Sequence, residues 1–246
     1  MATGVKRIHI MGLPLDVVDD DSLKEAVEGF YNLDDHRQIV LLDFHGFMKA
    51  RHSSEWKNAL LQAALIIPVS SLLTRAAGFL KLDAPPLRRT YPFVIRLLGI
   101  LEQKNKSVYL LGSTMQGVRK AESALRATFP GLQIVGRYAA HFSADREGDV
   151  ITAIKKSSPT LLLAGRGLKG HQLWISRKRT QLSAGLGLWE KTCFDVFSGK
   201  RPKPNDAAGA RLAKGFFGSL IRPWRFLRGF RYMQFFLMLL IEKIRR

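Results

Sequence analysis

Residues 107–142 constrain the fold more than any other segment of the chain. The stretch reads SVYLLGSTMQGVRKAESALRATFPGLQIVGRYAAHF. An apolar run, VYLL, is followed by a Gly-Ser-x-x-x-Gly turn, an amphipathic helical pattern, a Phe-Pro-Gly stop and a second strand-like run, LQIVG. This order predicts a βαβ unit. The turn after its first strand would place backbone N–H groups and a helix N-terminus at the strand ends, which suits a phosphate group.

Strand-like and helix-like segments alternate along the rest of the chain. Strands are expected at 5–11, 38–42, 64–68, 107–111, 132–135, 160–164 and 185–188. Helices are expected within 13–33 (with Asp20 or Asp21 as N-cap), 45–63, 71–82, 91–103, 116–128, 147–156 and 172–180. The alternation predicts an α/β, Rossmann-like fold with a mostly parallel sheet and helices on both faces. Ligands of such sheets bind at the carboxyl ends of the strands.

The charge of the chain is concentrated at one end. The net charge is +19, and residues 155–246 hold 20 of the 39 Lys and Arg but only 4 of the 20 Asp and Glu. A cationic region of this kind attracts anionic lipid, nucleic acid or phosphate-bearing substrates. The alternative is a merely solubilising surface, although such surfaces usually mix both signs.

The segment after residue 200 differs in character from the rest. We predict an α/β domain over 1–200 and a basic, amphipathic helical appendage over 201–246. Arginines recur every three residues among aromatic ones, at Arg222, Arg225, Arg228 and Arg231. Such a pattern suits a helix lying in a membrane interface, or a packed helix with solvated arginines. The apolar run 232–241 is too short to cross a bilayer.

Cys193 is the only cysteine, which excludes an internal disulfide and fits a reducing compartment. The first residues lack the pattern of a signal peptide. We therefore expect a cytoplasmic protein that is peripheral on the inner face of the cell membrane.

Three blocks of sequence resemble the WecG/TagA/CpsF family of bacterial glycosyltransferases. They are residues 109–142, LLLAGRGLKGHQLWI at 161–175 and CFDVFSGKRPKP at 193–204. The resemblance implies transfer of an N-acetylhexosamine, often N-acetylmannosamine, from a UDP-sugar to a polyprenyl-diphosphate-linked acceptor in cell-surface polysaccharide synthesis. It also implies an inverting mechanism without metal or other cofactor, an arginine-bearing appendage that docks on anionic membrane, and a possible homo-oligomer.

The resemblance assigns candidate roles to individual residues. The residues expected at the nucleotide-sugar are Gly112, Ser113, Gly117, Gly136, Tyr138, Gly167 and Lys169. Arg222, Arg225, Arg228 and Arg231 are expected to contact the membrane or a diphosphate. No metal ligands are expected.

The chain departs from the family pattern where the chemistry would occur. Val69 stands where the family has the aspartate taken to be the base, and valine cannot accept a proton. Asp43, beside His45 at a predicted strand end, and His171, in place of a sugar-contacting Gln, are the candidate catalytic residues. Each has a structural alternative: Asp43 would cap a loop, and His171 would begin a helix.

Two other functional interpretations remain open at this point. The chain could be a catalytically inactive descendant that acts as a membrane-associated binding or scaffold protein. It could also bind nucleic acid through its basic end, although no helix-turn-helix, zinc or RNA-recognition pattern is present, so we consider nucleic acid an unlikely partner.

Overall fold

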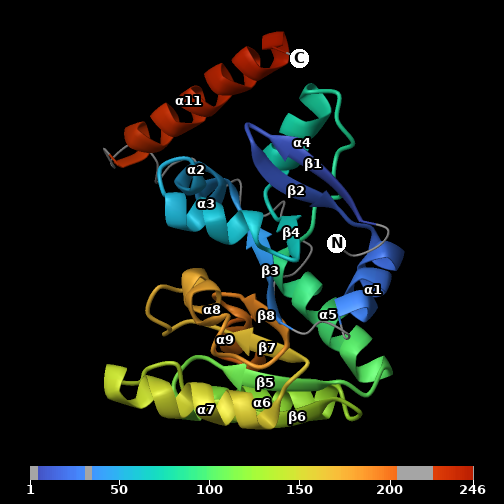
Figure 1. Cartoon of the computed structure of the whole chain (residues 1–246), viewed down its shortest axis with the longest axis vertical. Helices are drawn as coiled ribbons and strands as arrows, with labels where there is room; N and C mark the ends of the chain where they lie inside the picture. The colour runs from blue at the N-terminus through green and yellow to red at the C-terminus, as the bar shows by residue number, and fades with distance from the viewer. Residues whose placement is uncertain (1–4, 31–34, 204–223, 246) are drawn as a thin grey trace.

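A six-stranded parallel sheet organises the molecule (Figure 1). The computed structural model describes residues 5–30, 35–203 and 224–245, with side chains in the last range from residue 231 onward. The strands are β3 (His36–Leu42), β4 (Leu65–Pro68), β5 (Ser107–Leu111), β6 (Gln133–Tyr138), β7 (Leu161–Ala164) and β8 (Gly185–Trp189). Their order in the sheet is β4-β3-β8-β7-β5-β6. The α/β class with a parallel sheet is therefore confirmed.

Helices cover both faces of the sheet because its strands are apolar on both sides. One face carries α1 (Asp20–Gly29), α5 (Thr90–Gln103), α6 (Met115–Thr128) and α9 (Cys193–Phe197). The other carries α2 (Phe44–Ala50), α3 (Ser54–Leu61), α4 (Ser71–Phe79), α8 (Gln172–Lys178) and, after the short η2 (Ala144–Arg146), α7 (Glu147–Ser157). Along β3, Ile39 and Leu41 join the first core, whereas Val40 and Leu42 join the second.

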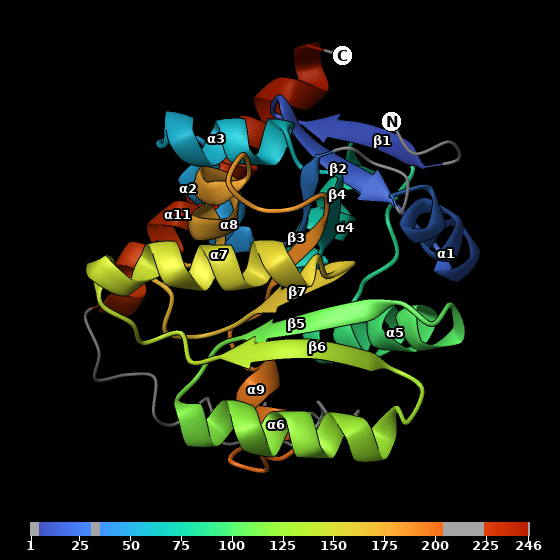
Figure 2. The same ribbon diagram turned by 60° about the horizontal axis from the view of Figure 1, so that its bottom comes forward.

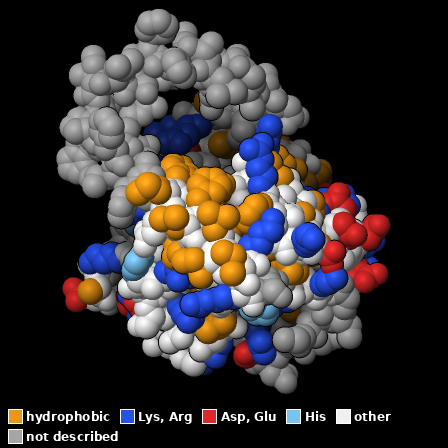
Figure 3. All heavy atoms as spheres, turned by 90° about the horizontal axis from the view of Figure 1, so that it is seen from above, with side chains coloured by type: hydrophobic (Ala, Val, Ile, Leu, Met, Phe, Trp, Pro, Cys, Tyr) orange, Lys and Arg blue, Asp and Glu red, His pale blue; other side chains and the backbone are white. Residues whose placement is uncertain are grey.

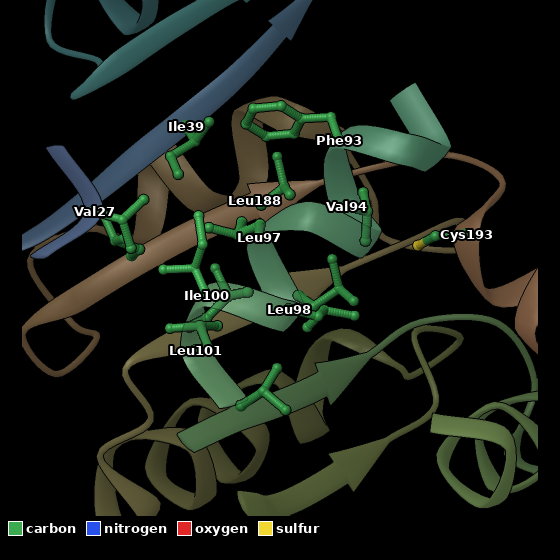
Figure 4. Close-up of a cluster of buried hydrophobic side chains, with 14 of the residues drawn as sticks. Val27, Ile39, Phe93, Val94, Leu97, Leu98, Ile100, Leu101, Leu188 and Cys193 are labelled. Atoms are coloured by element: carbon green, nitrogen blue, oxygen red, sulfur yellow. The ribbon is translucent and has the colours of Figure 1, made fainter. Parts of the chain in front are cut away.

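The core of the first face is built around α5 (Figure 4). Phe93, Leu97 and Leu101 repeat at helical spacing, and all are buried against the sheet residues Ile39 and Leu188. Burial of a side chain of this size stabilises the fold by about 1.5–3 kcal/mol. This packing holds α5 against the middle of the sheet.

The N-terminal segment differs from the expectation. β1 (Lys6–Ile10) and β2 (Leu13–Val17) form a separate antiparallel hairpin, whereas no strand is expected at β2 from the sequence. The two turn residues, Met11 and Gly12, have φ of 50° and 74°, as hairpins with two-residue turns prefer. The next helix is capped by Asp19, whose side chain accepts from the Ser22 N–H, and not by Asp20 or Asp21.

The C-terminal helix α11 (Trp224–Arg245) lies across α2 and reaches over the tip of the hairpin (Figure 1). Phe235 is fully buried and meets the rings of Phe44 and Phe47 edge-on, at 5.3 and 5.8 Å between centroids. At its far end Glu242 accepts the Met11 N–H at 2.8 Å. Among the described helices, none is both long and apolar enough to span a membrane.

Candidate active site

The turns that follow β5, β6 and β7 are joined at the carboxyl edge of the sheet. β5 and β6 run side by side in the same direction (Figure 2). The Gly112 N–H donates to the Tyr138 carbonyl at 3.1 Å, and the Ser113 N–H donates to the Arg166 carbonyl at 2.8 Å. The two Gly-rich turns, around Gly112 and Gly167, therefore meet at one edge and hold each other in place.

The turn after β5 leads directly into α6. Ser113 has φ of 57°, in the left-handed region. The N-cap of α6 is the next residue, Thr114, whose hydroxyl accepts the Gly117 N–H at 3.1 Å. Because the N–H groups of Gly112, Ser113 and Gly117 all have partners within the protein, a ligand at this turn would meet side chains and the remaining N–H groups of the first helical turn.

Three of the glycines in this region make room for aromatic rings of the protein itself. A Cβ atom on Gly112 or Gly165 would lie 2.6 or 2.3 Å from the ring of Phe194, which comes from α9. A Cβ atom on Gly136 would lie 2.4 Å from the ring of Tyr109. Their small size is therefore required by packing, independently of any ligand.

The turn after β7 presents exposed polar residues to the same edge. Gly167 has φ of 111° and leads to the exposed Lys169. His171, with φ of 52°, is the residue before α8, and its ring lies 5.5 Å from that of Trp189 at the end of β8. Trp189 is itself tied to the turn, since its indole N–H donates to the Gly165 carbonyl at 3.0 Å.

Helix α8, which begins after His171, is held by polar contacts. Gln38 of β3 donates to the Gln172 carbonyl at 3.0 Å, which places the start of α8 over β3. Trp174 donates to Glu147 at 2.7 Å, and Lys178 pairs with the same carboxylate at 2.6 Å. The Lys178 ammonium holds the pKa of Glu147 below its usual value. These contacts give His171 a fixed position.

Asp43 and Val69 follow neighbouring strands. The Val69 N–H donates to the Leu42 carbonyl at 3.0 Å, and Leu42 pairs with Pro68 in the sheet. The Asp43 carboxylate caps α2 by accepting the Gly46 N–H at 2.7 Å, and the residue is exposed. Asp43 therefore has the capping role given above as its structural alternative. Its exposed carboxylate also lies beside Val69, the position at which the family pattern has an aspartate.

One buried carboxylate at this edge was not predicted as a site residue from the sequence. Glu190 follows β8, is only 5% exposed, and accepts N–H groups of Thr192 and Cys193 at the start of α9. With burial, it raises the pKa of the Cys193 thiol. The sequence could have indicated Glu190, because this residue directly follows an apolar strand. Its bonds to α9 make it a support for Phe194.

The remaining predicted residues are placed as follows. The Tyr138 ring meets Phe142 edge-on at 6.2 Å. Arg231 is exposed on α11, and its Nη1 lies 3.1 Å from Nδ1 of His45 on α2. Arg222 and the side chains of Arg225 and Arg228 lie outside the described residues. Within the described part of the chain, no three His, Cys, Asp or Glu side chains are grouped so as to hold a metal ion.

Comparison with known proteins gives one family and several relatives. The model of the family described as "Glycosyl transferase WecG/TagA/CpsF family" matches residues 8–246. A Bacillus subtilis (strain 168) protein named N-acetylglucosaminyldiphosphoundecaprenol N-acetyl-beta-D-mannosaminyltransferase is 23% identical over 138 residues, covering 56% of this chain and 53% of the relative. Proteins of the same name from Bacillus spizizenii and Staphylococcus aureus (strain NCTC 8325) are 26% and 25% identical, covering 48% and 58% of this chain and 47% and 55% of the relatives. The chain thus matches about half the length of these relatives.

Proposed function

Since this chain belongs to the WecG/TagA/CpsF family of glycosyl transferases, we propose that it transfers an N-acetylhexosamine of the N-acetylmannosamine type from a UDP-sugar to a polyprenyl-diphosphate-linked acceptor. The names of the relatives specify an N-acetylmannosaminyl group and an acceptor carrying N-acetylglucosaminyl diphosphate on undecaprenol. The reaction we propose is inverting, needs no metal, and serves the synthesis of a cell-surface glycan.

The joined turns at the sheet edge are the observation that carries the donor part of this proposal. The hydrogen bond from Ser113 to the Arg166 carbonyl brings the Gly112 and Gly167 turns to the edge where α/β sheets bind ligands. In our proposal the UDP diphosphate lies by Ser113 and Lys169, and the uracil by Tyr138. Isothermal titration calorimetry with UDP tests this directly, and absence of binding at millimolar UDP would refute it.

We propose Asp43 as the base that takes the proton of the acceptor hydroxyl. It is an exposed carboxylate directly after β3, and Val69 directly follows the neighbouring strand β4. His171, in the turn after β7, then contacts the sugar or phosphate, since the residue is exposed at the same edge and its ring lies beside that of Trp189.

Asp43→Asn separates catalysis from capping. An asparagine side chain can still accept the Gly46 N–H, so the substitution keeps the cap of α2 but removes the basic carboxylate. We expect turnover to fall by about 100-fold or more, as for loss of a general base, with unchanged UDP affinity. Asp19→Asn, the same change at the N-cap of α1, is the matched control. Equal turnover in the two variants would exclude Asp43 as the base.

A catalytically inactive descendant is the second candidate, and Val69 favours it. Such a protein would keep the fold and the membrane-binding surface but would lack the residue that accepts the proton. UDP and lipid binding without sugar transfer, in both the wild type and Asp43→Asn, would establish it.

We further propose that α11 rests on an anionic membrane surface, which would place the protein on the cytoplasmic face of the cell membrane. Its outward face carries exposed apolar side chains at helical spacing: Met233, Phe236, Leu237, Leu240 and Ile244. Figure 3, which looks down on this side of the molecule, shows hydrophobic side chains gathered with Lys and Arg around them. This combination of an apolar face and flanking cations suits an interfacial helix.

Vesicle binding tests the membrane contact. Leu240 is 48% exposed on α11, and Leu61, at the end of α3, is 47% exposed. We expect Leu240→Ser to weaken binding to vesicles containing phosphatidylglycerol, and Leu61→Ser to have no effect. Each Lys or Arg near an anionic membrane surface contributes about 1 kcal/mol to the binding free energy. Equal binding of the wild type to neutral and anionic vesicles would therefore contradict the role of the cations.

A further inference from the structure

His141, in the turn after β6, lies where three turns meet at the carboxyl edge of the sheet. The residue before it, Ala140, donates its N–H at 3.1 Å to the carbonyl of Ser113, in the turn after β5. Ser113 in turn donates its own N–H at 2.8 Å to the carbonyl of Arg166, in the turn after β7. His141 is therefore one residue away from a hydrogen bond that ties its turn to the other two.

Gly167 allows the imidazole of His141 to rest on the turn after β7. A Cβ atom built on Gly167 would lie 2.9 Å from Nε2 and 3.1 Å from Cδ2 of that ring. A larger residue would have to displace the ring, and glycine is also the residue that adopts a φ of 111° without strain. The ring is thus placed two residues before the exposed Lys169.

The residues on either side of His141 are packed, whereas His141 itself is exposed. Ala140 is buried in the core that includes α7. Phe142 packs against the same core and meets the ring of Tyr138 edge-on. His141 therefore stands on a fixed backbone without filling the core. Its imidazole carries at least one N–H in either charge state, so it can donate a hydrogen bond to a ligand at this edge.

The charged residues of the three turns are all cationic. The turns span residues 112–114, 139–142 and 165–171. Their charged residues are Arg166 and Lys169, and both are exposed. The short η2 that follows the turn after β6 adds Asp145 and Arg146, one charge of each sign. Cationic and neutral N–H donors that meet in this way suit the oxygens of a phosphate group.

Glu147, at the start of α7, offsets part of this positive charge. Lys178, at 2.6 Å, makes the largest contribution to the lowered pKa of Glu147, and Lys169 adds a smaller one. Trp174 donates to the other oxygen of the same carboxylate at 2.7 Å. Because both carboxylate oxygens are bound by side chains of α8, the ammonium of Lys169 keeps donors for a ligand. A diphosphate held beside Lys169 would nevertheless need further donors, and His141 is placed to supply one.

We propose that His141 contacts the diphosphate of the UDP-sugar donor. This inference rests on the proposed function and adds to the donor site a residue to which the family resemblance gives no role. The Ser113 hydroxyl faces the first turn of α6, since a Cβ atom on Gly117 would lie 2.4 Å from its Oγ. In this arrangement the diphosphate lies over the first turn of α6, and His141 and Lys169 reach it from the turns after β6 and β7.

Two substitutions separate ligand binding from packing. His141→Phe keeps an aromatic ring against Gly167 but removes both ring nitrogens, whereas His141→Gln keeps a side chain that can donate. We expect calorimetry to show UDP binding weakened by about 10- to 100-fold in His141→Phe, the effect of losing one charge-assisted hydrogen bond, and by less in His141→Gln. Uridine, which has no phosphate, should bind equally to all three proteins. His52→Phe, at an exposed histidine in the turn after α2, is the matched control and should alter neither affinity.

The outcomes separate this inference from the proposed function. Wild-type UDP affinity in His141→Phe would overturn the inference and leave the proposed donor site intact. Equal losses of UDP and uridine affinity would also overturn it, because the ring would then shape the turn or contact the nucleoside. Inorganic pyrophosphate is the second probe. Pyrophosphate binding that is lost in His141→Phe, in a protein that does not bind UDP, would support the anion contact and reject the glycosyltransferase proposal. Binding of neither probe by the wild type would overturn both.

Discussion

The packing of Phe194 against two glycines gives a sharp test of how the sheet edge is built. A methyl group on Gly165 would lie 2.3 Å from one ring carbon of Phe194 and 2.6 Å from another. The ring is 2% exposed and has little room to move. We therefore expect Gly165→Ala to lower the free energy of unfolding by about 1–3 kcal/mol, as over-packing of a core does.

Removal of the ring should reverse this effect. Phe194→Ala alone should lower the free energy of unfolding by about 3–5 kcal/mol, because it leaves a cavity. In that background the new methyl of Gly165→Ala enters empty space, so it should cost nothing or restore some stability. The double-mutant cycle should then show a favourable coupling of about 1–3 kcal/mol between the two changes.

Urea unfolding of the wild type, Gly165→Ala, Phe194→Ala and the double variant measures this cycle. In a chain of this size, about 1 kcal/mol corresponds to roughly 2–4 °C in melting temperature. Gly78→Ala is the control, since a Cβ atom added to Gly78 on α4 would meet nothing within 4 Å, and it should stabilise the helix by about 0.5–1 kcal/mol. Additive effects at positions 165 and 194, within about 0.5 kcal/mol, would refute the packing account. A Gly165→Ala protein of normal stability with weak UDP binding would instead assign the glycine to the ligand.

Three further predictions concern other buried groups. Phe235→Ala should release α11 from α2 and speed amide hydrogen exchange across residues 231–245, whereas Phe236→Ala, at an exposed neighbour, should not; equal protection in both would contradict the packing in the structure. Burial lowers the pKa of His36, so its contribution to stability is present above about pH 6.5 and lost as pH falls through the lower folded pKa; urea unfolding should show a loss as pH falls below about 6.5 that is smaller in His36→Gln. Burial raises the pKa of Cys193, the only thiol, so iodoacetamide at about pH 8 should label the chain only after unfolding, and rapid labelling of the native protein would be inconsistent with this.

The parallel sheet was predictable because its strands are continuous apolar runs between helical patterns. Prediction failed at the N-terminal hairpin, where only Gly12 signals the turn and Met11 occupies the other left-handed position. Pro14 also argues against a strand, although an antiparallel hairpin with an open edge accommodates it. The five-residue α9 was missed because it is too short for a helical repeat pattern to reveal it.

The candidate site was predictable in its location but not in its contacts. A glycine after a strand indicates that another group packs closely against the backbone there. It does not indicate whether that group is a ligand or a ring such as that of Phe194, which comes from a distant segment. Likewise, Asp43 and His45 were visible as polar residues at a strand end. The pairing of His45 with Arg231 joins residues 186 positions apart, and only the tertiary structure brings them together.

The place of β8 in the sheet has a consequence for how the chain is assembled. β8 pairs with β3 on one side and β7 on the other, so it is the one strand joining β3 and β4 to β5, β6 and β7. During synthesis, β3 and β4 emerge from the ribosome long before β8, and β7 emerges shortly before it. Until residues 185–189 are made, each portion of the sheet exposes an unpaired strand edge, and the nascent chain depends on its helices, or on a chaperone, to keep those edges apart from other chains.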